Sequence, residues 1–318
     1  MRVHRGFRHL HPAPVALTIG NFDGVHLGHW ALLARLEEVA RFPGEQESTC
    51  AAAVMTFEPH PREFFAPETA PTRLTPLREK LEFFAEAGVD AVFVVPFNRA
   101  FAALPADAFV REVLHERLRV RHLILGDDFR FGCDRRGDLD YLREASRNFG
   151  FSVEATPTVT VGNERVSSSA VRHALEHGDL EKAAAFLGRP YTVRGRVVHG
   201  RRLGRKLGFP TANLYLRHTP LPLSGVFFIR AAVDGRVLEG VANVGLRPTV
   251  EAGIIRPLLE AYFFDFQGDL YGRHLSIRFV HKLRDEMKFS GLDDLQDQIT
   301  RDVEAARDFF GIQVEVLP

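Results

Sequence analysis

A change of hydrophobic pattern near residue 188 constrains the fold of this chain more than any other feature. Before it, short apolar runs alternate with helical stripes, and after it strand-like runs follow one another between Gly, Pro and Asp residues. Alternation is typical of a parallel sheet covered by helices, whereas successive strands favour an antiparallel barrel. The 318 residues are enough for two domains. We therefore predict domains at residues 1–186 and 187–318.

The first half has the pattern of a doubly wound α/β domain of the Rossmann-like type. Between its apolar runs, residues such as Leu77, Leu81 and Phe84 recur at helical spacing. Runs of this length, free of alternation, are typical of buried parallel strands. The predicted strands are 15–20, 52–57, 91–95 and 122–126.

The second half has the pattern of a small antiparallel β-barrel closed by a C-terminal helix. Residues 292–310 carry one apolar stripe at helical spacing, and the runs before them are short and β-rich. The predicted strands are 194–198, 226–233, 237–241, 258–264 and 275–280.

Charge and composition limit the class of function. Lys plus Arg and Asp plus Glu both number 41, and this balance argues against a dedicated nucleic-acid partner. Two cysteines are too few for a disulfide framework, and the apolar runs are too short to span a membrane. We therefore expect a cytoplasmic enzyme with no membrane partner, and a disordered or surface segment at the histidine-rich start with His4, His9 and His11.

The zero net charge is the sum of two unequal halves. Residues 1–186 hold 22 basic and 26 acidic residues, whereas the remainder holds 19 basic and 15 acidic ones. Between residues 189 and 233 there are nine Lys or Arg and no acid. This local excess indicates a binding site for a highly anionic ligand.

The most informative segment, residues 20–29, reads GNFDGVHLGH and joins the first predicted strand to a helix. Gly24 and Gly28 allow close approach of the backbone to a ligand, and helix N–H groups attract anions. His26 and His29 are three residues apart, which predicts both imidazoles on one side of the opening turn. Two imidazoles there are suited to a phosphorus centre that gains charge. The alternative is a helix-capping His beside a surface His.

This segment resembles the HxGH signature of the nucleotidyltransferases. Its extended form resembles the FAD synthetase module of prokaryotic bifunctional riboflavin kinase/FAD synthetases. Residues 56–61 (TFEPHP), 126–132 (GDDFRFG) and 166–172 (VSSSAVR) extend the resemblance, although Ser169 stands where the family usually has Thr. The first two also end predicted strands, so we expect them to form one crevice with residues 20–29.

The resemblance implies that the phosphate of FMN attacks the α-phosphorus of ATP and releases pyrophosphate. His26 and His29 would contact the ATP phosphates, and Arg172 the pyrophosphate. The remaining residues assigned to ligand binding in this domain are Gly20, Phe22, Asp23, Gly24, Gly28, Asp128, Ser168 and Ser169.

A Gly-rich basic loop in the second half, GRRLGRKLGFPTAN at residues 200–213, resembles the PTAN motif of riboflavin kinases. Residues 243–249, 265–272 and 283–289 match further segments of that family in order. Because the loop lacks carboxylates, Mg²⁺ bound there would take oxygen ligands such as Thr211 and Asn213. The other residues assigned to nucleotide or flavin binding are Gly204, Lys206 and Arg284.

Glu260 interrupts the apolar run 257–264, where an acid is costly to bury unless it has a role or a partner. The resemblance makes it the base that accepts the proton of the terminal ribityl hydroxyl of riboflavin. A strand Glu that faces solvent is the alternative. Ala261 and Tyr262 stand where the family commonly has a His, and Phe227 stands where it often has Tyr.

Two other functions stay open at this point. One is a different adenylyl- or cytidylyltransferase, which the HxGH signature alone does not exclude, although the second domain argues against it. The other is a flavin-sensing or storage protein without activity. The resemblance favours an enzyme whose partners are the small molecules riboflavin, FMN, FAD and ATP.

Overall fold

The computed structural model describes residues 1–7, 13–42, 49–200, 203–216, 221–248 and 255–312. The chain divides into two compact units. The first unit comprises residues 1–71 and 75–168, and the second comprises residues 72–74 and 169–318. The domain boundary expected between residues 186 and 187 stays a prediction. By their contacts, residues 169–186 group with the second unit.

The first unit is built on a six-stranded parallel sheet, which confirms the predicted α/β architecture. The strand order is β1-β4-β3-β2-β5-β6, so the chain runs from β2 to one edge and then returns to β5 on the other side of β2. The six strands are β1 (Arg2–Arg5), β2 (Val15–Ile19), β3 (Ala51–Glu58), β4 (Ala91–Pro96), β5 (Val120–Gly126) and β6 (Ser152–Thr156).

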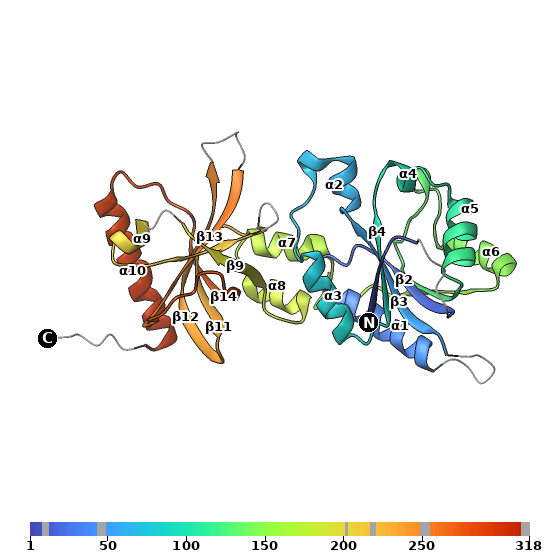
Figure 1. Cartoon of the computed structure of the whole chain (residues 1–318), viewed down its shortest axis with the longest axis horizontal. Coiled ribbons are helices and arrows are strands. Elements are labelled where there is room, and N and C mark those ends of the chain that lie inside the picture. The colour runs from blue at the N-terminus through green and yellow to red at the C-terminus, as the bar shows by residue number, and fades with distance from the viewer. Residues whose placement is uncertain (8–12, 43–48, 201–202, 217–220, 249–254, 313–318) are drawn as a thin grey trace. The chain divides into compact units, whose positions relative to one another are not determined.

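Helices cover both faces of this sheet (Figure 1). On one face, α1 and α3 pack on strand residues such as Ala16 and Val54. On the other face, η2 and α6 pack on residues such as Leu17 and Met55. Alternate residues of β2 to β5 therefore enter different cores, which explains the unbroken apolar runs of these strands. The helices are α1 (Leu27–Arg41), α2 (Pro61–Phe65), α3 (Leu77–Glu86), α4 (Arg99–Ala102), α5 (Ala106–Ala108), the π-helix η2 (Phe109–Arg117) and α6 (Leu139–Phe149).

The start of the chain differs from the prediction. Residues 2–5 form the edge strand β1, which pairs in parallel with β4, and the ring of His4 stacks on Phe93 at 5.0 Å between centroids. The disorder alternative is therefore wrong for His4, because pairing with β4 orders this polar strand, although most of its residues are exposed at the surface. His9 and His11 lie outside the described residues. Short elements complete this unit: η1 (Pro67–Thr69), η3 (Cys133–Arg135) and the hairpin of β7 (Thr160–Val161) and β8 (Glu164–Arg165).

The second unit contains the predicted antiparallel barrel, closed in the order β10-β13-β12-β11-β14-β9. Helix α10 packs its stripe, Val303 and Ala306, on Phe228 and Val241 of the barrel wall (Figure 1). The strands are β9 (Thr192–Val198), β10 (Ala212–Tyr215), β11 (Gly225–Val233), β12 (Arg236–Pro248), β13 (Ile255–Phe263) and β14 (His274–Arg284). The helices are α7 (Ser168–Glu176), α8 (Leu180–Leu187), α9 (Leu203–Lys206) and α10 (Leu292–Phe310).

Candidate active sites

Three strand ends meet at one edge of the parallel sheet, as predicted. Strands β3, β2 and β5 are neighbours in the sheet, and residues 56–61, 20–29 and 126–132 lie at their carboxyl ends. Strand β2 is also the point where the strand order reverses. Open α/β sheets bind ligands at such switch points.

The segment between β2 and α1 has a strained backbone. Phe22, Gly24 and Val25 have φ values of 49°, 88° and 40°, which lie in the left-handed region. That region is costly for Phe and especially for the β-branched Val. Residues held in such conformations persist only where their surroundings fix them, and they cluster at functional sites. We call residues 20–29 the HxGH loop below.

His26 and His29 lie side by side, as their spacing predicts. Their rings stack at 3.7 Å between centroids with an interplanar angle of 16°. His26 is the N-cap of α1, and its Nδ1 accepts a long hydrogen bond of 3.4 Å from the backbone N–H of His29. The capping alternative is therefore correct for His26, whereas His29 is half-buried rather than on the surface. Their contact with ATP stays a prediction.

The residues around this pair are tightly packed. A Cβ on Gly28 would lie 3.2 Å from the Nδ1 and Cε1 of His26, so glycine leaves the imidazole its place. The Phe22 side chain is fully buried and lies 5.0 Å from the ring of His29 between centroids. A Cβ on Gly20 would in turn lie 3.1 Å from the Phe22 ring. Phe22 thus supports His29 from the core.

Asp23 and Ser168 hold the HxGH loop in place. The buried carboxylate of Asp23 accepts a 3.0 Å hydrogen bond from the backbone N–H of Thr75. The hydroxyl of Ser168 donates to the backbone carbonyl of Asp23 over 2.8 Å. These bonds occupy groups that the sequence assigns to ligands, so both side chains have at least a structural role.

Asp128 lies at the end of β5 and pairs with the hairpin of β7 and β8. Its carboxylate accepts a 2.7 Å bond from Arg165, and both side chains are more than half exposed. The neighbouring Asp127 accepts a 2.7 Å bond from the hydroxyl of Thr158. The hairpin is thereby tied to the carboxyl end of the sheet, where Asp128 is predicted to line the pocket.

Ser169 and Arg172 lie on α7 within the second unit. Arg172 is buried, and its Nε donates a 2.6 Å hydrogen bond to the backbone carbonyl of Thr72 in the same unit. The predicted role of Arg172 in holding pyrophosphate is untested by this contact.

The barrel places the proposed base between two amides. Glu260 of β13 is the direct cross-strand neighbour of Asn213 on β10 and of Asn243 on β12. Its chain neighbours Leu259 and Ala261 are fully buried inside the barrel, so the Glu260 side chain projects from the outer face. It is half-buried there, which argues against a simple solvated Glu. Directly opposed residues have Cβ atoms about 4.5–5.5 Å apart, so these three polar side chains lie side by side. We call Asn213, Glu260 and Asn243 the Glu260 row.

Asn213 has a buried amide oxygen that no described residue satisfies. It is 5% exposed, and its Oδ1 has no hydrogen-bond partner among the described residues. A Cβ on Gly200 would lie 2.5 Å from this amide, so only glycine fits against it. Gly204 similarly lies against Thr211, where a Cβ would be 3.2 Å from the hydroxyl. The side chain of Lys206 lies outside the described residues.

Two residues that depart from the family pattern, Phe227 and Tyr262, pack against aromatic side chains. Phe227 is fully buried in the barrel interior and packs edge-on against Phe279. Such a site suits Phe, which has no hydroxyl to satisfy. Tyr262 lies beside Phe209 and Phe264 on the outer face, where burial raises the pKa of its hydroxyl.

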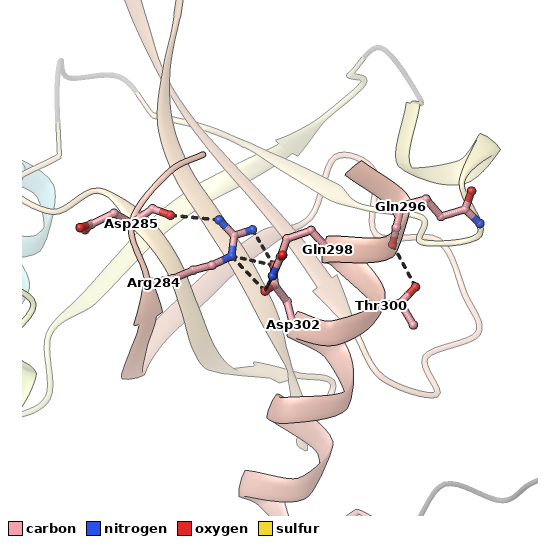
Figure 2. A network of polar contacts seen from close by, with 6 residues as sticks. All are labelled: Arg284, Asp285, Gln296, Gln298, Thr300 and Asp302. Atoms are coloured by element: carbon pink, nitrogen blue, oxygen red, sulfur yellow. Dashed lines mark hydrogen bonds and ion pairs between the residues drawn. The ribbon is translucent and has the colours of Figure 1, made fainter. Parts of the chain in front are cut away.

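Arg284 joins the last barrel strand to α10 (Figure 2). Its guanidinium donates from Nε and from a terminal nitrogen to the carboxylate of Asp302, with the shortest bond at 2.6 Å. Gln298 donates a further bond of 2.9 Å to the same carboxylate, and the backbone carbonyl of Asp285 accepts from Arg284. The Arg284 and Asp302 side chains are only 19% and 6% exposed. The structure thus gives Arg284 a structural role, and its contact with a ligand stays a prediction.

Asp302→Ala should destabilise the second unit by about 3–5 kcal/mol, because removal of one partner leaves the guanidinium half-buried without its counter-charge. Hydrogen exchange of barrel amides during urea titration measures the loss. The control is Asp285→Ala, which removes an exposed carboxylate whose pKa is lowered by Lys282. It should cost much less. Equal, small losses in both variants would show that the pair contributes little.

Two residues of these sites escaped the sequence analysis. Lys80 is buried on the face of α3 that also carries Leu77 and Phe84. A charge on an apolar stripe is the signal that would have found it, and the same signal did find Glu260. Asn243 begins a segment that resembles the riboflavin kinases, but sequence analysis assigned it no role, because its place beside Glu260 depends on the register of β12 and β13.

Several known proteins align with nearly the whole chain. The bifunctional riboflavin kinase/FMN adenylyltransferase of Escherichia coli (strain K12) is 48% identical over 98% of this chain and 99% of its own. The protein of the same name from Pseudomonas fluorescens is 48% identical, with coverages of 96% and 97%. That from Haemophilus influenzae is 45% identical, with coverages of 93% and 94%.

A solved structure shares the fold. A crystal structure described as a macrolide-efflux protein from Streptococcus pneumoniae superposes with a TM-score of 0.80 at 28% identity, and covers 97% of this chain and 99% of its own. In the part of the present chain that the structure describes, no helix has the length and apolar character needed to cross a membrane.

Family models match both halves. The FAD synthetase model matches residues 9–170, and the riboflavin kinase model matches residues 187–310. The two matches cover the HxGH loop and the Glu260 row respectively. With two matched models in this order and relatives that align from end to end, the chain belongs to the family of bifunctional riboflavin kinase/FMN adenylyltransferases.

Proposed function

We propose that the predicted domain at residues 187–318 phosphorylates riboflavin to FMN with MgATP, and that the predicted domain at residues 1–186 adenylylates FMN with ATP to give FAD and pyrophosphate. Both activities follow from the family, whose members use ATP and generally a divalent metal. The observation that carries the assignment to residues is that each predicted domain has its own cluster of polar side chains on an apolar frame. The HxGH loop follows β2, and the Glu260 row extends across three neighbouring strands of the barrel.

Adenylyl transfer at the HxGH loop needs no covalent enzyme intermediate. A phosphate oxygen of FMN attacks the α-phosphorus of ATP, and the bond from that phosphorus to the bridging oxygen of pyrophosphate breaks. His26 and His29 would donate hydrogen bonds to the phosphate oxygens as negative charge grows. Arg172, Ser168 and Ser169 would hold the leaving pyrophosphate by charge-assisted bonds. The stacked imidazoles support this assignment.

Phosphoryl transfer at the barrel would use Glu260 as the general base. Its carboxylate takes the proton of the terminal ribityl hydroxyl while that oxygen attacks the γ-phosphorus of ATP, and ADP leaves. Asn213 and Asn243 flank Glu260 on the neighbouring strands and would orient the carboxylate and the phosphates.

The donor set near Asn213 fits a hard cation. The buried Oδ1 of Asn213 without a described partner and the hydroxyl of Thr211 are oxygen ligands of the kind that Mg²⁺ prefers. We propose that these two residues hold Mg²⁺ together with nucleotide oxygens and water. When bound, the ion neutralises charge on the phosphates. The enzyme would operate in the cytoplasm, consistent with two cysteines, Cys50 and Cys133, that form no disulfide in the described structure.

Incubation of the purified chain with riboflavin, ATP and Mg²⁺ should yield FMN first and FAD later, as separated by chromatography. EDTA should stop FMN formation, and added Mg²⁺ should restore it. Conversion of supplied FMN alone, without use of riboflavin, would support the rival adenylyltransferase. Bound flavin that is never converted would support a storage or sensing protein.

A further inference from the structure

Helix α3 carries a buried lysine that the proposed mechanism does not use. Lys80 is 3% exposed, whereas Arg78 of the same helix has 82% of its side chain exposed and pairs with Glu82. Lysine is almost never fully buried unless its ammonium has partners, because removing the charge from water is costly. A cation kept at this position therefore calls for an explanation beyond packing.

The ammonium of Lys80 points at the start of the HxGH loop. Its Nζ donates a 2.9 Å hydrogen bond to the backbone carbonyl of Asn21. The hydroxyl of Thr56, at the end of β3, donates to the same carbonyl over 3.4 Å. Asn21 immediately precedes Phe22, the first loop residue with a left-handed backbone. Lys80 thus holds the peptide at which the strained turn begins.

Helix α3 supports the loop at a second point. The backbone N–H of Thr75, just before the helix, donates to the buried carboxylate of Asp23. The two contacts lie on either side of Phe22, which is the residue that packs against His29. A strained segment needs such fixing from several sides, since its own backbone favours other conformations.

We propose that Lys80 is a positioning residue for adenylyl transfer. Its ammonium fixes the Asn21 carbonyl and with it the strained turn, so that His26 and His29 keep their orientation. The inference rests on the proposed function of the HxGH loop.

The central test replaces Lys80 with Met, which has a similar length and no charge. Removing one partner of a buried hydrogen bond is destabilising, but the hydroxyl of Thr56 still donates to the Asn21 carbonyl, so the variant should fold with a lower unfolding temperature. We expect kcat for FAD formation from FMN and ATP to fall about 10- to 100-fold, the scale of losing a preorganised electrostatic contact. Riboflavin kinase activity should be unchanged, and the unfolding temperature should fall because the Asn21 carbonyl loses one donor. Arg78→Met, on the exposed side of the same helix, is the matched control and should leave all three unchanged.

Two further readouts separate positioning from simple packing. The NMR signals of the His26 and His29 rings should shift in Lys80→Met and stay in place in Arg78→Met. Lys80→Arg retains a cationic donor and should recover most of the rate. This variant still tests the proposal if Lys80→Met does not fold. Normal kcat with unmoved histidine signals, or equal losses in the Met and Arg variants, would overturn the proposal.

A parallel assay of His29→Ala shows which claim fails. If His29→Ala is slow and Lys80→Met is normal, the role of Lys80 is wrong and the site assignment stands. If both variants are fully active, the assignment of adenylyl transfer to the HxGH loop is itself wrong.

Discussion

Glu260→Gln should abolish FMN formation from riboflavin while the conversion of supplied FMN to FAD continues at the normal rate. Gln keeps the size and the cross-strand position between Asn213 and Asn243 but accepts no proton. Loss of a general base costs about 10²- to 10⁴-fold in rate. The two reactions are measured separately, by supplying either riboflavin or FMN with MgATP and separating the flavins.

Glu239→Gln is the matched control for Glu260→Gln. Glu239 lies on β12, the strand next to Glu260, but pairs with Arg230 instead. Its replacement should leave both activities intact. Loss of both activities in Glu260→Gln would argue against independent sites, and near-normal FMN formation would exclude Glu260 as the base.

His29→Ala should lower FAD formation from FMN and ATP by about two orders of magnitude, the scale for one preorganised hydrogen-bond donor. The change removes the ring that stacks on His26 and contacts Phe22, without touching the backbone bonds that begin α1. FMN formation from riboflavin should be unaffected. The rates are compared in purified protein at saturating FMN and ATP.

His115→Ala controls for the general effect of removing a histidine from the first unit. His115 is exposed on η2, and its ring lies beside that of Phe149. This variant should form FAD at the normal rate. Near-normal turnover of His29→Ala would remove His29 from the mechanism.

Local pattern was enough to predict most elements of the fold. The buried strands β2 to β5 and helix α10 follow directly from apolar periodicity, since each element is buried on the faces that its pattern marks. Strands β1 and β6 were missed, because their residues are largely polar and each pairs at an edge of the sheet. Their order depends on pairing with a distant neighbour, which no local pattern records.

Some features of the candidate sites could be predicted from the sequence, and others could not. The adjacency of the three strand ends was predictable, because the carboxyl ends of parallel strands meet at one edge of a sheet. The partners of individual side chains were not. Arg284 binds Asp302 on another element, and Asp23 binds the backbone of Thr75, 52 positions away in the chain. Such contacts depend on the tertiary packing of distant segments.

A mixture of the Glu260→Gln and His29→Ala variants tests the central claim that one chain holds two independent sites for successive reactions. Each variant alone should make little or no FAD from riboflavin and MgATP. Together they should make FAD at a rate close to that of FMN adenylylation by Glu260→Gln, because FMN released by His29→Ala reaches the intact site of the other variant. If the mixture forms no more FAD than His29→Ala alone, while each variant retains its own half-reaction, the account of two independent sites is contradicted.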